Sequence, residues 1–325
     1  MNRRAIAIGG SAGSIPVLKR LLGQLSADLD APVFVAVHVG SEGRNVLADI
    51  LDACGPCPVR TAEEGLPVTC GTVYVAPADH HLLILDGAIR LGRGPRENMA
   101  RPAIDPLFRS VAASHGPGAL GVVLTGYLND GVSGLASIKE RGGLTVVQNP
   151  SDAEAPDMPL SALADVEVDY RAPSSDLPDL LTRLVAMPPD PAPASPVPPA
   201  LRLEIDIALG RPCTTDVLES IADPVALSCP SCSGVLSQIH GHPLRFRCQV
   251  GHAYSAQALS VQQEGALDEA LRVALRIVEE RVTLLTRMAA DALAAGRQHT
   301  HDQFLEKASE LRSQADILRK AALRM

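Results

Sequence analysis

The sequence predicts an α/β fold with a doubly wound, mostly parallel sheet of the Rossmann-like type, then a small zinc-ribbon-like module and a C-terminal antiparallel helical hairpin. Three observations lead to this prediction. Short apolar runs are followed by Gly-containing turns and helix-like stretches, as in residues 5–25. A Pro-rich segment interrupts the chain after residue 186. Beyond that segment, Cys and His residues with metal-ligand spacing precede a long amphipathic pattern.

Composition and charge exclude several classes of protein. The chain has 325 residues, a net charge of −8 and an aromatic content of 2%, which argue against a nucleic-acid binder because that function needs a basic face. The first apolar run is too short for a signal peptide, and no run is long enough to insert directly into a membrane. Seven cysteines without a paired framework suit a reducing compartment. We therefore expect a cytoplasmic protein.

The first strand-turn-helix unit carries a candidate nucleophile. Ser11 lies in the Gly-x-Ser-x-Gly turn of residues 9–13, between an apolar run at 5–8 and a helix-like stretch at 15–25. Small flanking residues permit a tight turn that exposes the hydroxyl group, and the helix N-terminus behind it offers N–H groups to an oxyanion. A phosphate-binding or purely structural loop is an equal alternative on this motif alone.

Two further apolar runs end at residues that complete a catalytic set. His38 follows the buried-strand pattern of residues 32–37, and Asp130 comes shortly after the run at 120–125. The carboxyl ends of parallel strands meet at one edge of a sheet, so we expect Ser11, His38 and Asp130 to lie together there. The chain order Ser, His, Asp differs from the Ser, Asp, His order of α/β-hydrolases and argues against that fold.

These residues resemble the catalytic domain of chemotaxis protein-glutamate methylesterases, from about Arg4 to about Leu184. The resemblance rests on six motifs in this order: Ile8 to Gly13, Val37-His38, Val75-Ala76-Pro77 with His81, Arg101 to Phe108, Leu124 to Gly131, and Met158-Pro159. It implies that Ser11 is the nucleophile, His38 the general base and acid, and Asp130 the residue that orients the imidazole. It also implies an oxyanion hole formed by the backbone N–H groups of Ala12 and Tyr127, and no cofactor for catalysis.

The same resemblance implies a substrate and partner. The family hydrolyses γ-glutamyl methyl esters on the cytoplasmic helices of methyl-accepting chemoreceptors, and some members deamidate receptor glutamines. This chain resembles a stand-alone catalytic domain, because its first strand begins by Arg4 and leaves no room for a preceding receiver domain. It departs from the family at Ser14, Tyr127 and Leu128. Two other functions therefore stay open, a non-catalytic signalling adaptor and an esterase for small-molecule carboxylic esters.

Two other motifs have competing interpretations. By resemblance, His81 either supports the catalytic residues from behind or contacts the substrate, while a partly exposed loop histidine is an equal alternative. Cys54 and Cys57 have the spacing of a redox pair. Because Pro58 follows directly and lacks a backbone donor, a helix spanning that pair is not expected, and we do not assign a redox function.

The second half of the chain begins with a Pro-rich linker at residues 187–200. An acidic segment at 201–209 alternates apolar and polar residues, which predicts a strand. In the module spanning 201–255, four residues have the spacing of a structural zinc ribbon: Cys229, Cys232, Cys248 and His252. His240 or His242 are alternative fourth ligands, and a small hairpin held by apolar contacts is the alternative to metal.

Residues 256–325 repeat apolar side chains at three- and four-residue steps, which predicts two antiparallel helices. We expect a break from Gly296 to Asp302 and a second helix from 304 to 323. The apolar faces are expected to pack on each other, to form a homodimer or to dock the helices of a signalling partner. The predicted division is thus a catalytic domain at 1–186, the linker, the ribbon-like module and the helical hairpin.

Overall fold

The computed structural model describes residues 3–38, 46–189, 196–212 and 214–323. The chain forms two compact units, the first ending at Leu259 and the second beginning at Ser260. The first unit contains both the predicted catalytic domain and the predicted ribbon-like module. The boundaries predicted within that unit, at residues 187–200 and 201–255, stay predictions.

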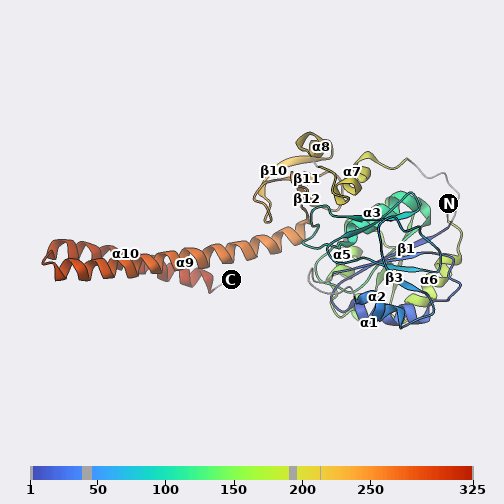
Figure 1. Cartoon of the computed structure of the whole chain (residues 1–325), viewed down its shortest axis with the longest axis horizontal. Coiled ribbons are helices and arrows are strands. Elements are labelled where there is room, and N and C mark those ends of the chain that lie inside the picture. Colours follow the sequence, from blue (N-terminus) through green and yellow to red (C-terminus); the bar gives the residue numbers. More distant parts are fainter. Residues whose placement is uncertain (1–2, 39–45, 190–195, 213, 324–325) are drawn as a thin grey trace. The chain divides into compact units, whose positions relative to one another are not determined.

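A seven-stranded parallel sheet forms the centre of the first unit and confirms the predicted α/β class (Figure 1). Its strands are β1 (Ala5–Gly10), β2 (Val33–Val37), β3 (Val59–Thr61), β4 (Val73–Val75), β7 (Ala119–Val123), β8 (Leu144–Gln148) and β9 (Tyr170–Ala172). Their order across the sheet is β3-β4-β2-β1-β7-β8-β9. Strands β2, β4 and β3 lie on one side of β1, and β7, β8 and β9 lie on the other side. This reversal of the strand order at β1 is a topological switch point, where open α/β sheets bind ligands.

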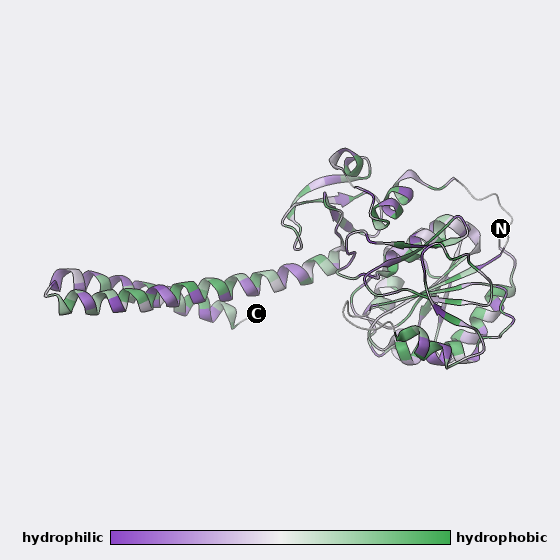
Figure 2. Ribbon diagram, in the orientation of Figure 1, coloured by the Kyte–Doolittle hydropathy of each residue, from purple (hydrophilic) through white to green (hydrophobic). Residues whose placement is uncertain are grey.

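Helices cover both faces of the sheet. The helices on one face are α1 (Ser14–Gln24), α2 (Leu47–Asp52) and α6 (Leu177–Ala186), and those on the other are α3 (Ile104–His115), α4 (Val132–Glu140) and α5 (Asp157–Asp165). Alternate residues of β1 face opposite cores: Ile6 and Ile8 pack toward the first set of helices, and Ala5 and Ala7 toward the second. Figure 2 shows the resulting concentration of hydrophobic residues along the strands.

Smaller elements complete the α/β part of the first unit. A β-hairpin of β5 (His81–Leu85) and β6 (Ala88–Gly92) packs against α3, and 3-10 turns cover Gly116–Gly118 and Pro150–Asp152. The long connection from β6 to α3 covers residues 93–103 and has no strand or helix longer than a single β-bridge. Residues of this connection contact Asp130 at the sheet edge and Ala253 near the end of the first unit.

We use the name Cys/His module for residues 199–255. Its elements are α7 (Pro199–Ala208), α8 (Thr215–Glu219) and an antiparallel sheet of β10 (Ala222–Ser228), β11 (Val235–Ile239), β12 (Arg245–Cys248) and β13 (Ala253–Ser255). The strand predicted at 201–209 is wrong, because these residues form helix α7. The alternation of apolar and polar residues fits a strand, but helical spacing packs Leu201, Ile205 and Ala208 against Leu83 and leaves Glu204 facing Arg245 and Arg247.

The second unit contains most of α9 (Ala256–Ala294) and all of α10 (Gln298–Ala322), which confirms the helical hairpin. Helix α10 begins six residues earlier than predicted, because the polar residues after Gly296 form its first turn rather than a loop. The buried residues of this unit are small: Ala289, Ala292, Ala308 and Ala315. Larger apolar residues such as Leu284 and Ile317 stay exposed, and the predicted homodimer or partner contact stays a prediction. Among the described residues, no helix is long and apolar enough to cross a membrane.

Candidate active site and metal centre

Ser11 lies directly after β1, in the turn that leads into α1. Its backbone N–H donates to Thr125 O (2.9 Å), which ties the turn to the end of β7. Gly13 has φ 75°, a left-handed conformation that glycine adopts without steric cost, and it lets the chain enter α1 at Ser14. Gly126 is also required here, because a Cβ atom at that position would lie 2.8 Å from Ser11 Cβ. The turn therefore places Ser11 at the sheet edge, close to the backbone of Thr125 and Gly126.

The sheet brings Ser11, His38 and Asp130 together as the sequence predicted. They follow β1, β2 and β7, which are adjacent strands at the switch point. His38 Nδ1 lies 3.2 Å from Ser11 Oγ, and His38 Nε2 lies 2.7 Å from Asp130 Oδ2. The carboxylate only accepts, so Nε2 carries the proton in the neutral ring and leaves Nδ1 free to accept from the serine hydroxyl. This is the arrangement that activates a serine nucleophile.

The environment of Asp130 favours its anion. Only 2% of the residue is exposed, and burial by itself would raise its pKa. The hydrogen bond and charge of His38, the backbone N–H of Ile104 (2.6 Å) and the side chain of Asn98 (2.8 Å) outweigh burial and lower the pKa of Asp130. Asp130 is therefore held as a carboxylate that fixes the imidazole.

The residues expected in the oxyanion hole lie on the two turns beside Ser11. Ala12 follows the serine, and Tyr127 is in the loop after β7 with 63% of its surface exposed. Within the described residues, no protein acceptor takes a hydrogen bond from the backbone N–H of either residue. Leu128, in the same loop, has φ 62°, a left-handed backbone conformation that glycine adopts more easily than leucine.

His81 lies beneath the site rather than at its surface. It is fully buried, its Nε2 donates to Pro95 O (3.0 Å), and its Nδ1 accepts from the backbone N–H of Ala103 (3.3 Å). Burial lowers the pKa of His81, which favours the neutral ring. Because Ala103 precedes Ile104, whose N–H reaches Asp130, this geometry favours support of the catalytic residues over contact with substrate.

The sequence analysis did not single out Asn98, and it noted Asp105 only within the Arg101 to Phe108 motif without placing it beside Asp130. Asn98 and Asp105 lie on the connection before α3 and at its first turn, and Asn98 Nδ2 donates to both Asp105 Oδ2 (3.1 Å) and Asp130 Oδ1 (2.8 Å). Burial and then the charge of Asp130 raise the pKa of Asp105 to about 7. Asn98 lies outside the family motifs in a loop without a strand or periodic pattern, so no signal in the sequence connected it with Asp130, some thirty positions further on.

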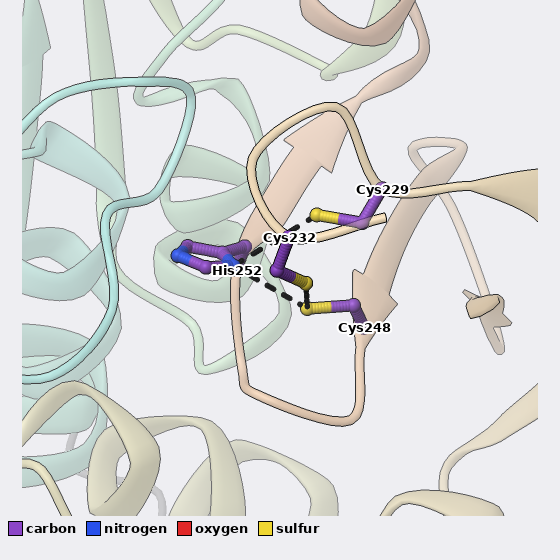
Figure 3. A group of neighbouring side chains, drawn as sticks. All are labelled: Cys229, Cys232, Cys248 and His252. Carbon is purple, nitrogen blue, oxygen red and sulfur yellow. Dashed lines mark hydrogen bonds between the residues drawn. The ribbon is translucent and has the colours of Figure 1, made fainter. Parts of the chain in front are cut away.

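The four predicted metal ligands converge on one point in the Cys/His module (Figure 3). Cys229 and Cys232 come from the turn after β10, Cys248 is the last residue of β12, and His252 lies directly before β13. Their ligand atoms lie within 4.8 Å of one another. His240 and His242, the alternative ligands, instead face Asp223 and Asp165. The cluster therefore has the membership that the Cys-x-x-Cys and Cys-x-x-x-His spacing predicted.

The distances within this cluster fit a tetrahedral zinc ion. Zn–S bonds of about 2.3 Å in tetrahedral geometry place two sulfur atoms about 3.8 Å apart. Cys232 Sγ and Cys248 Sγ are 3.6 Å apart, and His252 Nδ1 lies 3.5 Å from Cys248 Sγ and 3.8 Å from Cys229 Sγ. Three thiolates and one imidazole form a closed set without an open position, as in structural rather than catalytic zinc sites.

Comparison with known proteins agrees with this site. The family model described as CheB methylesterase matches residues 6–181. A putative protein-glutamate methylesterase/protein-glutamine glutaminase of Leptospira interrogans is 39% identical over 185 residues, covering 57% of this chain and 96% of that protein. Protein-glutamate methylesterase/protein-glutamine glutaminase 3 of Anaeromyxobacter dehalogenans is 39% identical over 163 residues, covering 50% of this chain and 48% of that protein. The chain thus spans about half the length of the second relative.

A solved structure resembles the same region. The CheB methylesterase catalytic domain of Thermotoga maritima superimposes with a TM-score of 0.55 and 29% sequence identity, covering 57% of this chain and all of that one. The family match covers more than half of the chain and includes Ser11, His38 and Asp130. This chain belongs to the CheB methylesterase family.

Proposed function

We propose that this chain is a protein-glutamate methylesterase that hydrolyses γ-glutamyl methyl esters on the cytoplasmic helices of methyl-accepting chemoreceptors. The observation that carries the proposal is the continuous hydrogen-bonded set Ser11–His38–Asp130 at the switch point of the sheet. The names of the relatives from Leptospira and Anaeromyxobacter support the same reaction. This substrate places the reaction in the cytoplasm.

The proposed reaction has two steps. His38 Nδ1 takes the proton of Ser11 Oγ as that oxygen attacks the ester carbonyl carbon, and Asp130 stabilises the imidazolium. The tetrahedral oxyanion accepts hydrogen bonds from the N–H groups of Ala12 and Tyr127. The carbon–methoxy bond then breaks, methanol leaves with the proton from His38, and the glutamyl group stays on Ser11. A water molecule, deprotonated by His38, hydrolyses this acyl-enzyme to the free glutamate and the serine.

The same groups suffice for deamidation of a glutamine. The leaving group is then ammonia, which also takes its proton from His38, and the acyl-enzyme is identical. An amide is the poorer substrate because its leaving group is more basic. We therefore include glutamine deamidation in the proposal as a slower reaction of the same site.

We also propose that Cys229, Cys232, Cys248 and His252 hold a structural zinc ion. The distances within the cluster support this assignment, and the six described cysteines form no disulfide. The ion would supply crosslinks between the turn after β10 and the turn after β12, and it would take no part in the ester chemistry. Catalysis itself needs no cofactor in this proposal.

Methanol release from methylated cytoplasmic fragments of chemoreceptors tests the proposed function. We expect the wild-type chain to release methanol and Ser11→Ala to lose at least about 10³-fold in rate, because the acyl-enzyme cannot form. Ser26→Ala removes an exposed hydroxyl group after α1 and should retain the wild-type rate. A folded wild-type chain that releases no methanol would contradict the proposal, as would full activity of Ser11→Ala.

A further inference from the structure

Asn98 joins the triad to the Cys/His module. The residue is 9% exposed, and its backbone has φ 48°, a conformation that asparagine tolerates better than most residues. On one side Nδ2 donates to Asp130 Oδ1 (2.8 Å) and Asp105 Oδ2 (3.1 Å). On the other side Oδ1 accepts from the backbone N–H of Ser255 (2.8 Å). Every hydrogen-bonding group of this amide thus has a partner either at the triad or in β13.

The partners fix the orientation of this amide. Two carboxyl groups lie on its NH₂ side, and an N–H donor lies on its oxygen side. If the amide were rotated by 180°, its oxygen would face Asp105 and Asp130, and its NH₂ group would face the N–H of Ser255. The donor in β13 therefore selects the one orientation in which Asn98 donates to Asp130.

Strand β13 makes this contact because residues 96–98 extend its sheet. Ala253 N–H donates to Arg96 O (3.3 Å), and Asn98 N–H donates to Ala253 O (2.8 Å), which forms a parallel bridge. At the next step along the strand, Ser255 donates to the side chain of Asn98. Ser255 Oγ also donates to Asn129 Oδ1, beside Asp130 in the chain. Ser255 of β13 therefore contacts both Asn98 and Asn129, the two asparagines next to Asp130 in space or in the chain.

A buried charge network holds the two sides of this contact together. Glu97, which precedes Asn98, pairs with Arg109 of α3 and with Arg247 of β12 (3.0 Å). Arg247 also donates to Gly251 O (2.8 Å), in the turn that carries the predicted metal ligand His252. All three charged side chains are at most 2% exposed, so water competes little for these bonds.

We propose that Asn98 is a positioning residue through which β13 of the Cys/His module holds the carboxylate of Asp130 in place for His38. The inference rests on the proposed function for its link to turnover, but its geometry concerns the triad alone. Without the amide, Asp130 Oδ1 loses its side-chain donor and keeps only the longer hydrogen bond from the backbone N–H of Asp105 (3.4 Å). The imidazole then loses part of its fixed orientation.

Four variants test this inference. Asn98→Asp keeps the shape and the acceptor for Ser255 but replaces the donor to Asp130 with an oxygen. Ser255→Pro removes the N–H that orients Asn98, whereas Ser255→Ala removes only the hydroxyl group. Asn149→Asp is the matched control, because Asn149 uses only its acceptor, toward the N–H of Ser151 after β8.

We expect Asn98→Asp to lower kcat for methanol release by about 10- to 100-fold with little change in KM, the usual cost of removing a group that orients a reacting residue. Ser255→Pro should lose more of kcat than Ser255→Ala. Asn149→Asp should retain the wild-type kcat. Unfolding curves of all four variants show whether each chain is folded at the assay temperature.

A second readout separates positioning from a merely structural role. The His38 Nε2 proton, hydrogen-bonded to Asp130, is expected to give a far-downfield proton NMR resonance. That resonance should shift or broaden in Asn98→Asp and Ser255→Pro and stay unchanged in Asn149→Asp. Wild-type kcat and an unchanged resonance in folded Asn98→Asp, or an unchanged resonance in Ser255→Pro, would overturn the inference. Failure of the wild-type chain to release methanol would refute the proposed function instead, and the resonance would still decide this inference.

Discussion

Two neighbouring aspartates, Asp130 and Asp105, have opposite pKa shifts. Asp130 faces His38, a backbone N–H and Asn98, and its pKa is lowered. Asp105 is buried next to that negative charge and has a pKa raised to about 7, although Arg109 and the N–H of Gly134 favour its anion. Separate environments thus assign separate protonation states to neighbouring aspartates. The extra proton on Asp105 near neutral pH limits the negative charge beside the triad.

Asp105 should make the stability of the fold depend on pH. An unfolded aspartate titrates near 3.8 and the folded one near 7, so the folded chain binds the extra proton between these values. The contribution of Asp105 to the free energy of unfolding should therefore fall as the pH rises from about 4 to about 7. Asp105→Asn removes this contribution and should reduce that fall. Urea unfolding across this pH range measures it, with Asp86→Asn, in the exposed turn between β5 and β6, as the control. Equal slopes for Asp105→Asn and the wild-type chain would contradict the assignment.

The triad could be predicted from the sequence because each of its residues follows a recognisable strand. Parallel strands bring their carboxyl ends to one edge, so the positions of Ser11, His38 and Asp130 follow from the fold class alone. Asn98 and Ser255 could not be predicted in the same way. Their contact joins two segments 157 positions apart through a loop without periodicity, and it depends on how the Cys/His module docks.

At the scale of elements, the Cys/His module has little apolar core of its own. Its buried apolar residues form two small clusters, one around the predicted ligands Cys229 and Cys248 and one made of Leu218, Ile221, Ala222 and Ile239. A sheet of four short strands with so small a core needs another source of stability, and metal ligation is a common one. Because the module has no large core of its own, contacts with the catalytic domain determine the structure of residues 201–209. Those contacts, to Leu83, favour the helix α7 over the strand that the sequence pattern predicted.

Metal removal should therefore loosen β10 to β13 specifically. We expect the purified chain to contain about one zinc ion, and Cys232→Ser to lose metal because one of the four ligands becomes a poor one. Hydrogen exchange in β12 and β13 should then accelerate, while exchange in the central strands of the parallel sheet stays slow. Cys54→Ser is the control, because its hydroxyl group can replace the thiol contact with Ile50 O. Full metal content in Cys232→Ser, or unchanged exchange without metal, would contradict this account.

At the scale of the whole molecule, the Cys/His module is packed as part of the catalytic unit. Glu204 of α7 faces three arginines, Arg245, Arg109 (3.5 Å) and Arg247 (3.3 Å), and their charges lower its pKa despite its burial. Breaking such a buried network by removing one partner typically costs about 3–5 kcal/mol. The sequence predicted both modules but not this joint interior, because burial of charged residues has no periodic signature. The helical unit from Ser260 onward is compact by itself.

The proposed mechanism requires Ser11 to be a nucleophile that His38 activates. Reaction with a serine-directed phosphonate, followed by mass spectrometry of proteolytic peptides, tests it most directly because it needs no knowledge of the receptor. We expect one adduct, on the peptide containing Ser11, and a rate that falls by at least about 10³-fold in His38→Ala. An adduct on another serine, no adduct on the folded chain, or an unchanged rate in His38→Ala would contradict the claim.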